Sequence, residues 1–168
     1  MSGEGRIIIF KVGDYLAHPG HGGCTVRELS HRTCEGKNIL YFVLVPACEP
    51  QTTILLPVER IDQSGVRALI TATEAEQIMD FMCETEAAWD CDHRNRKQSY
   101  EAVIKGPDLF ALAKMIKELL VQETKTMLGS FEKGILPRAQ KRLFSEIALA
   151  KGLCFDETVR LASRAIQA

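Results

Sequence analysis

The sequence lacks the features by which secreted, membrane and zinc-binding proteins are usually recognised. Its six cysteines are scattered without a CxxC pair, whereas a structural zinc ion needs four ligands at close spacing. The triplet Cys91-Asp92-His93 would supply half of such a site, but no second pair accompanies it. No apolar run approaches the roughly 18 residues of a membrane-spanning helix, and no apolar leader precedes the cysteines. We therefore expect reduced thiols in a cytoplasmic protein, with no metal, no other cofactor and no membrane partner.

An excess of charge of one sign is also absent. The formal net charge is −1, and the balance holds along the chain, with seven basic and seven acidic residues through Arg67 and fourteen against fifteen thereafter. A protein without an overall positive field is not drawn to nucleic acid from a distance. Any contact with DNA or RNA must therefore be local, or be supported by another partner.

No arrangement of residues indicates catalysis. His18 and His21 lie in a loop with three Gly and one Pro between residues 18 and 23, but no carboxylate pair or Ser/Cys nucleophile accompanies them. We interpret them as turn residues with exposed imidazoles. No helical pattern follows these glycines, so they do not form a phosphate-binding loop. We expect no enzymatic activity and no small-molecule substrate.

What is present begins with a pattern of short strands. An apolar run starts at residue 7 and leads to a turn at Gly13-Asp14, and residues 35–38 predict a hairpin turn. Residues 39–45 are continuously apolar, which is typical of a central strand buried on both sides. Residues 52–56 predict another short strand. Short strands joined by tight turns indicate a small curled β-barrel.

Helical patterns follow from about residue 68. Thr73 and Glu76 have the spacing of a capping box, and the apolar positions after Asp108 follow the helical period closely. Gly134 indicates a connection, Pro137 suits the first turn of a further helix, and Asp156 suits the cap of a final short one. The chain is thus predicted to be α+β, with a β-barrel domain in residues 1–67 and an all-α helical bundle in residues 68–168.

The single tryptophan, Trp89, lies outside any apolar periodicity. Acidic and small residues precede it at positions 84–88, and a basic stretch follows it with Arg94, Arg96 and Lys97. A Trp in such a setting is either an anchor at a joint between domains or a probe for a partner. Because it lies close to the change from strand patterns to helical patterns, we expect it near the joint, and both interpretations stay open.

The sequence resembles a known family over most of its length. Four motifs are similar, in order and spacing, to the RNA-polymerase-interacting domain of the CarD family of bacterial transcription regulators: Phe10-Lys11-Val12-Gly13-Asp14, His18-Pro19-Gly20-His21-Gly22, Ile54-Leu55-Leu56-Pro57-Val58 and Ser64-Gly65-Val66-Arg67. The second half agrees through the lone Trp, the Arg/Lys cluster, Tyr100-Glu101-Ala102-Val103-Ile104-Lys105-Gly106 and Glu146-Ile147-Ala148-Leu149-Ala150.

The resemblance implies a fold and a function. Residues 1–67 would be a Tudor-like (SH3-like) barrel that docks on the β subunit of RNA polymerase, which would place the protein on the nucleoid. Residues 68–168 would reach promoter DNA at the upstream edge of the transcription bubble, where the family's Trp enters the minor groove with weak sequence specificity and stabilises the open complex. Carried over, the DNA-binding residues are Trp89, Arg94, Arg96 and Lys97, and the polymerase-binding residues are Arg32, Ile54, Leu55 and Leu56.

Two departures from the family pattern bear on this hypothesis. Asp90 and Asp92 separate Trp89 from the basic residues, and their charges would repel phosphates. Leu55 stands where some members carry a basic residue, so contact with the polymerase there would depend on apolar packing. The alternative is an adaptor that docks on the polymerase without productive DNA contact.

Overall fold

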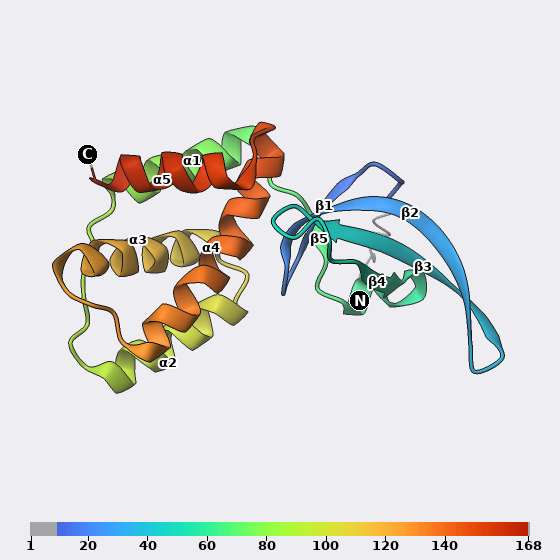
Figure 1. Cartoon of the computed structure of the whole chain (residues 1–168), viewed down its shortest axis with the longest axis horizontal. Coiled ribbons are helices and arrows are strands. Elements are labelled where there is room, and N and C mark those ends of the chain that lie inside the picture. The colour runs from blue at the N-terminus through green and yellow to red at the C-terminus, as the bar shows by residue number, and fades with distance from the viewer. Residues whose placement is uncertain (1–9, 168) are drawn as a thin grey trace, which may run out of the picture.

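The computed structural model describes residues 10–167 and shows two domains side by side (Figure 1). A five-stranded antiparallel sheet comes first, and helices α1 to α5 follow. This arrangement confirms the predicted α+β class. The first part of the predicted apolar run, residues 7–9, lies outside the described residues.

The sheet is ordered β4-β3-β2-β1-β5, so that β4 and β5 are its edges. Its strands are β1 (Tyr15–His18), β2 (Gly22–Cys34), β3 (Lys37–Pro46), β4 (Ile54–Pro57) and β5 (Arg67–Ala68), with a 3₁₀ helix at Val58–Gln63 between the last two. The side chains that form its buried core are all apolar or thiol: Phe10, Leu16, Cys24, Val26, Phe42, Leu44 and Leu56.

The hairpin of β2 and β3 turns where the sequence predicts. Glu35 and Gly36 form a two-residue connection with φ angles of 52° and 75°, as a hairpin turn with the twist of its strands requires. The predicted burial of residues 39–45 is confirmed only in part, because Phe42, Val43 and Leu44 are buried while residues 39–41 are half exposed. The hairpin extends beyond the rest of the sheet (Figure 1), so its far end has no covering layer.

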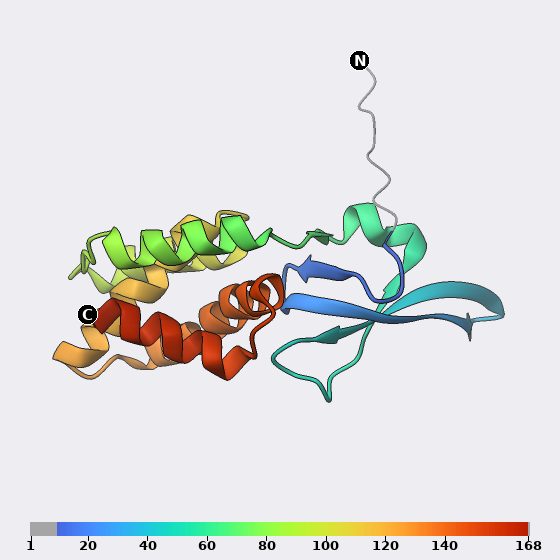
Figure 2. The same cartoon turned by 90° about the horizontal axis from the view of Figure 1, so that it is seen from above.

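The helical domain consists of α1 (Ala72–Glu84), α2 (His93–Lys105), α3 (Leu109–Lys125), α4 (Ser130–Lys151) and α5 (Phe155–Gln167). Helices α1 and α5 pack against each other, and Figure 2 shows them as separate helices running alongside one another when the bundle is seen from above. Apolar residues from all five helices form one core, whose fully buried members include Leu112, Ile116, Leu143 and Phe144. Asp108 caps α3, as predicted, by accepting hydrogen bonds from the N–H groups of Phe110 and Ala111 at 2.9 and 3.1 Å.

Three helix starts differ from the prediction. The capping box of α1 pairs Thr71 with Glu74, not Thr73 with Glu76; the sequence offers the spacing twice, and a hydrogen bond from the N–H of Ile70 to Glu146 holds the chain just before Thr71. Helix α4 begins at Ser130 and contains Pro137 in its interior.

Pro137 leaves the carbonyl of Lys133, four residues earlier, without its helical partner. Proline is tolerated at this point of α4 because both residues are exposed, which gives that carbonyl access to water. Gly134 lies inside the same helix and forms no connection. Helix α5 begins at Phe155, where the carbonyl of Cys154 accepts the N–H of Thr158 at 3.1 Å, and Asp156 lies in the first turn instead of capping it.

Strand β2 and helix α4 join the two domains. Ser145 Oγ accepts the N–H of Gly23 at 2.8 Å, and a Cβ atom at Gly22 would lie 2.7 Å from the carbonyl oxygen of Arg142. Arg67 donates two hydrogen bonds of 2.8 Å to Glu146, whose side chain is 1 % exposed. These contacts hold the sheet and the bundle in a defined orientation.

Candidate nucleic-acid and polymerase interfaces

Trp89 lies in the connection between α1 and α2, partly exposed and packed against the core of the helical bundle. In Figure 1 this connection is at the end of the bundle that faces away from the sheet. The joint between the domains is made by β2 and α4 instead. The interpretation of Trp89 as an anchor at that joint is therefore wrong, because a complete helix, α1, separates it from the last strand.

Arg96 holds Trp89 from the side of α2. Its guanidinium carbon lies 4.2 Å from the centre of the Trp89 ring, which is the geometry of a cation–π contact. Its Nε and Nη2 atoms donate to Glu132 Oε1 at 2.9 and 2.6 Å, and Nη1 donates to the carbonyl of Asp90 at 2.6 Å. Arg96 is only 8 % exposed. Its hydrogen-bonding groups are thus directed into the protein, whereas the sequence suggested a phosphate contact.

Glu132, from the first turn of α4, completes this cluster of Trp89, Arg96 and Glu132. It is 1 % exposed. Burial by itself would raise the pKa of this carboxyl, but the hydrogen bonds from Arg96 and from the backbone outweigh burial, and the pKa lies below its usual value. The carboxylate is therefore charged at neutral pH and fixes the guanidinium that stacks on the tryptophan. Sequence reasoning missed Glu132, since nothing local links residues 36 positions apart.

The other two predicted DNA-binding side chains are free to meet a partner. Arg94 and Lys97 are exposed on the first turns of α2, and Lys97 Nζ lies 5.7 Å from the centre of the Phe131 ring. Together with Trp89 they form an exposed surface at the start of α2.

The two aspartates before α2 bond to the backbone. Asp92 is the N-cap of α2, and its carboxylate accepts the N–H groups of Arg94 and Asn95 at 2.9 and 3.2 Å. Asp90 accepts the N–H of Asp92 at 2.9 Å. An Asp just before a helical pattern is a recognisable cap signal, which the sequence interpretation treated only as a charge. Both carboxylates are engaged in forming the turn between Trp89 and α2.

The predicted polymerase-binding residues lie on the sheet but do not form one patch of side chains. Along β4, Leu55 is 37 % exposed, Leu56 is 8 % exposed within the sheet core, and Ile54 is partly buried against that core. Arg32 is exposed on β2, where it pairs with Ile39, beyond the last β3 residue that pairs with β4, Tyr41. The structure thus offers an edge strand with one outward apolar side chain.

The loop with His18 and His21 forms no catalytic arrangement in the structure. The two imidazole rings lie 5.0 Å apart, and His21 Nδ1 is 3.9 Å from Glu49 Oε2. Burial, and then the neighbouring His21, lower the pKa of His18. Between residues 10 and 167 no group of three or more His, Cys, Asp or Glu side chains is placed to hold a metal ion. None of the helices in that range is both long and apolar enough to cross a membrane.

Comparison with protein families agrees with both halves of the structure. Residues 10–70 match the family model described as the CarD-like/TRCF RID domain, and residues 77–162 match the one described as the CarD C-terminal domain. The chain belongs to the CarD family. It is also 21 % identical over 145 residues to the Bacillus subtilis (strain 168) protein named "Putative transcription factor YdeB", in a match that covers 86 % of this chain and 94 % of that protein.

Membership of the CarD family gives the protein a general role. CarD-family proteins are transcription regulators that interact with RNA polymerase. The sheet domain of this chain corresponds to the RID domain, and its helical bundle corresponds to the CarD C-terminal domain. The resemblance stated from the sequence motifs is thereby confirmed.

Proposed function

We propose that this CarD-family protein docks on the β subunit of RNA polymerase through its sheet domain and stabilises the promoter open complex through Trp89. The observation that carries the proposal is the cluster of Trp89, Arg96 and Glu132, in which a buried ion pair holds a partly exposed tryptophan at the end of the bundle. A rigid apolar side chain at a base step offsets part of the cost of unstacking DNA, which amounts to about a few kcal/mol per step.

Each residue then has a distinct part. Trp89 inserts into the minor groove at the upstream edge of the bubble, where the strands begin to separate. Arg94 and Lys97, exposed beside it on α2, contact phosphates, which positions the protein on the duplex without reading its sequence. Arg96 acts through Trp89, since its guanidinium bonds to Glu132 and Asp90. This amends the original hypothesis, in which Arg96 also contacted phosphate.

Docking on the polymerase uses the exposed edge of the sheet. Among the described residues, strand β4 pairs only with β3, so its outer side presents backbone groups that no described strand pairs, and a strand of a partner can bind to them. Leu55 adds an apolar contact on that edge, and Arg32 adds a positive charge on the projecting hairpin. Tethering to the polymerase raises the effective concentration of the protein at the promoter, which a chain of net charge −1 needs.

The test is the lifetime of open complexes formed by purified bacterial RNA polymerase on one promoter, with no protein, wild type or Trp89→Ala. We expect wild type to lengthen the lifetime about tenfold, equivalent to about 1.4 kcal/mol, and Trp89→Ala to lose most of this effect. Phe110→Ala is the matched control, because Phe110 is an aromatic residue of the same domain with 42 % exposure. Equal activity of Trp89→Ala and wild type, with both still bound to the polymerase, would support the adaptor function instead.

Docking is tested separately by binding to the isolated β subunit. Leu55→Asp should weaken binding about tenfold or more, because it places a charge within an apolar contact. Leu29→Asp is the control, since Leu29 is also on the sheet and is 45 % exposed. Equal loss with both variants would indicate a general effect on the sheet and contradict docking at β4.

A further inference from the structure

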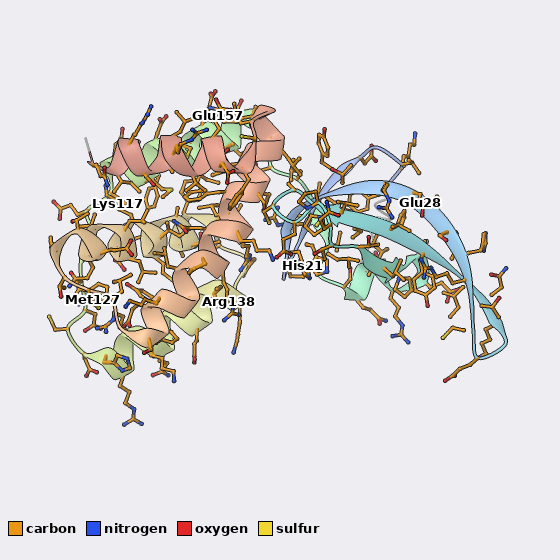
Figure 3. All side chains as sticks on the ribbon, viewed as in Figure 1. His21, Glu28, Lys117, Met127, Arg138 and Glu157 are labelled. Carbon is orange, nitrogen blue, oxygen red and sulfur yellow. The ribbon has the colours of Figure 1, made fainter. Side chains whose placement is uncertain are left out.

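The junction between the two domains contains a second positively charged surface, separate from the one at Trp89. Two adjoining cavities of about 230 Å³ each lie there and share Pro19 and Arg142 in their linings. One is also lined by Arg67 and Lys105, and the other by Arg138 and Lys141. Figure 3 labels Arg138 on the helical side of this junction and His21 on the sheet side. We call this surface, made of Arg67, Lys105, Arg138, Lys141 and Arg142, the junction groove.

The junction groove carries a net positive charge within a chain whose total charge is −1. Two of its five cations are paired with carboxylates: Arg67 with Glu146 at 2.8 Å and Lys141 with Glu49 at 2.5 Å. Arg142 donates to the carbonyl oxygens of Ile104 and Gly106. Burial, and then the charge of Arg67, lower the pKa of Arg142.

Two cations of the groove are available to a partner. Lys105 and Arg138 are both exposed, and neither forms an ion pair in the part of the chain that the structure describes. Lys105 is the last residue of α2, and Arg138 lies on α4 beside it, since the carbonyls of Ile104 and Gly106 are bound by Arg142 one turn further along α4. An exposed, unpaired pair of cations above a concave surface is a suitable site for phosphate groups.

Helix α2 connects this groove to Trp89. Trp89 precedes the start of α2, and Lys105 is its final residue. With 13 residues, α2 is about 20 Å long, which corresponds to the rise of about six base pairs of duplex DNA. Figure 1 shows α2 along one edge of the bundle, with one end at the α1–α2 connection and the other toward the sheet. A duplex lying along this edge would reach both surfaces.

We propose that Lys105 and Arg138 bind the phosphate backbone of the duplex upstream of the base step that Trp89 enters. This inference rests on the proposed function, which puts Trp89 at the upstream edge of the bubble. Because the strands separate on the downstream side of that step, the duplex available to the far end of α2 is the upstream one. The junction groove thus adds a second, sequence-independent DNA contact and sets the direction in which the duplex leaves the wedge.

The first test does not depend on polymerase. Binding of the full-length protein to duplex DNA is measured at several salt concentrations for wild type, Lys105→Gln/Arg138→Gln and Arg160→Gln/Arg164→Gln. The last pair is the matched control, because it removes the same charge from exposed positions of α5, at the opposite edge of the bundle in Figure 1. The logarithm of the association constant falls with the logarithm of the salt concentration, and loss of two phosphate contacts should make this slope less steep by about 1.8. The control pair should leave the slope unchanged. An equal slope for all three proteins overturns the inference.

The second test locates the contact on a promoter. Open-complex lifetime is compared on normal DNA and on DNA whose phosphates about six base pairs upstream of the bubble are replaced by neutral methylphosphonates. On normal DNA, wild type should lengthen the lifetime about threefold more than Lys105→Gln/Arg138→Gln, because the double variant loses part of the binding energy of two phosphate contacts. On neutral DNA, wild type and the double variant should give equal lifetimes. A difference that persists on neutral DNA contradicts the inference.

The outcomes separate this inference from the proposed function. If wild type lengthens the lifetime on neither template but the salt slope falls as expected, the groove binds DNA and the wedge mechanism is wrong. If the double variant loses polymerase binding and keeps its salt slope, the groove contacts an acidic surface of the polymerase and the inference is wrong.

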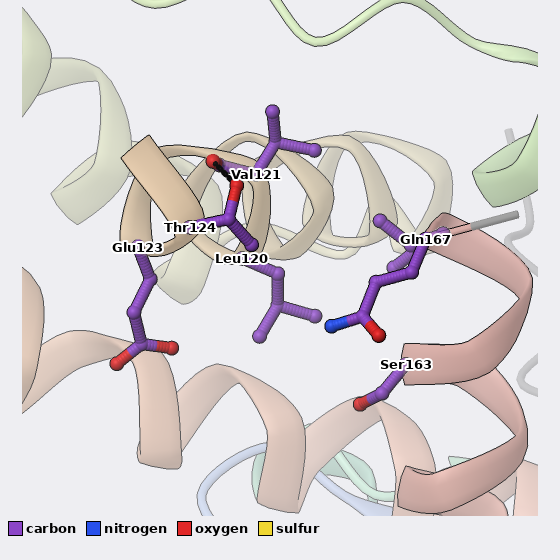
Figure 4. A pocket seen from close by; sticks show the side chains of 7 residues that line it. Leu120, Val121, Glu123, Thr124, Ser163 and Gln167 are labelled. Carbon is purple, nitrogen blue, oxygen red and sulfur yellow. Dashed lines mark hydrogen bonds between the residues drawn. The ribbon is translucent and has the colours of Figure 1, made fainter. Parts of the chain in front are cut away.

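A larger cavity, with a volume of about 510 Å³, lies between the ends of α3 and α5. It is lined by Leu120, Val121, Glu123, Thr124, Ser163, Ile166 and Gln167 (Figure 4). Its lining mixes apolar and polar side chains without a cluster of one kind, so it indicates no particular occupant.

Discussion

The two domains of this protein are stabilised in different ways. The buried cluster of the sheet holds apolar and thiol side chains, and its strands are joined by backbone hydrogen bonds. Among the described residues, every buried polar or charged side chain belongs to the helices: Arg96, Lys117, Glu132, Arg142, Ser145, Glu146 and Thr158. Because backbone hydrogen bonds join its strands, the sheet depends little on buried polar or charged side chains.

This difference matches the part of the structure that each domain holds in place. A sheet that binds a partner through its edge needs only a correctly paired strand there. The bundle holds one tryptophan and one domain joint in place through ion pairs to buried carboxylates, since a misplaced partner would leave a buried charge unpaired. Arg96–Glu132 fixes Trp89, and Arg67–Glu146 fixes the joint. Four predictions test this comparison.

The largest expected effect comes from breaking the ion pair behind Trp89. Glu132→Ala leaves Arg96 buried without its partner, which should lower the free energy of unfolding by about 3–5 kcal/mol. Chemical denaturation followed by far-UV circular dichroism measures this. Glu123→Ala, at an exposed position of α3, should change stability by no more than about 0.5 kcal/mol. Similar stabilities for the two variants would show that the pair does not hold the bundle.

A smaller loss is expected at the joint. Gly22→Ala forces a Cβ against Ser145 Oγ and places it 2.7 Å from the carbonyl oxygen of Arg142. Gly36 has a similar φ, 75° against 71°, and an alanine Cβ there would have no neighbour within 4 Å among the described residues. Gly22→Ala should therefore destabilise the protein by about 1–3 kcal/mol more than Gly36→Ala. The thermal melt of Gly22→Ala should show two transitions, one for each domain, because the contact that joins the domains is disturbed. Equal effects would mean that the close approach of β2 and α4 is not required.

The third prediction concerns pH. The pKa of Glu132 in the folded protein lies below its usual value of 4.5, so its contribution to stability is present above that value and is lost as the pH falls through the folded pKa. The difference in unfolding free energy between wild type and Glu132→Gln should therefore narrow as the pH is lowered below about 4.5. Glu84→Gln, at an exposed position of α1, is the control. A difference that stays constant would contradict the assignment.

The smallest expected effect concerns the chemical reactivity of two cysteines in the sheet. Cys24 is fully buried, and burial raises its pKa to about 12, whereas Cys34, on the same strand, is exposed. At neutral pH an alkylating reagent should modify Cys34 rapidly and Cys24 only on unfolding. Mass spectrometry of the labelled peptides measures both rates. Rapid labelling of Cys24 in the native protein would show that the sheet core opens easily.

Much of the fold could be predicted because local spacing determines it. The turn at Glu35-Gly36 and the cap of α3 at Asp108 require only neighbouring residues. The start of α4 could not be predicted, because Gly134 and Pro137 indicate a break, while contacts of Phe131 and Glu132 with α2 stabilise the first turn. The choice of Thr71 over Thr73 likewise depends on a hydrogen bond to Glu146, 76 residues from Ile70.

The sequence by itself determined the α+β class and the family, and it singled out Trp89 with its neighbouring cations as candidates. Tertiary structure decided where each of these side chains lies and what it contacts. Arg94, Arg96 and Lys97 are equivalent as a basic stretch, but the turn of α2 directs Arg96 inward, where Glu132 meets it from α4. Lys105 and Arg138 are 33 residues apart in sequence and come together only because Arg142 of α4 binds the carbonyl oxygens at the end of α2. Contacts between distant residues depend on how helices pack, which local pattern does not encode.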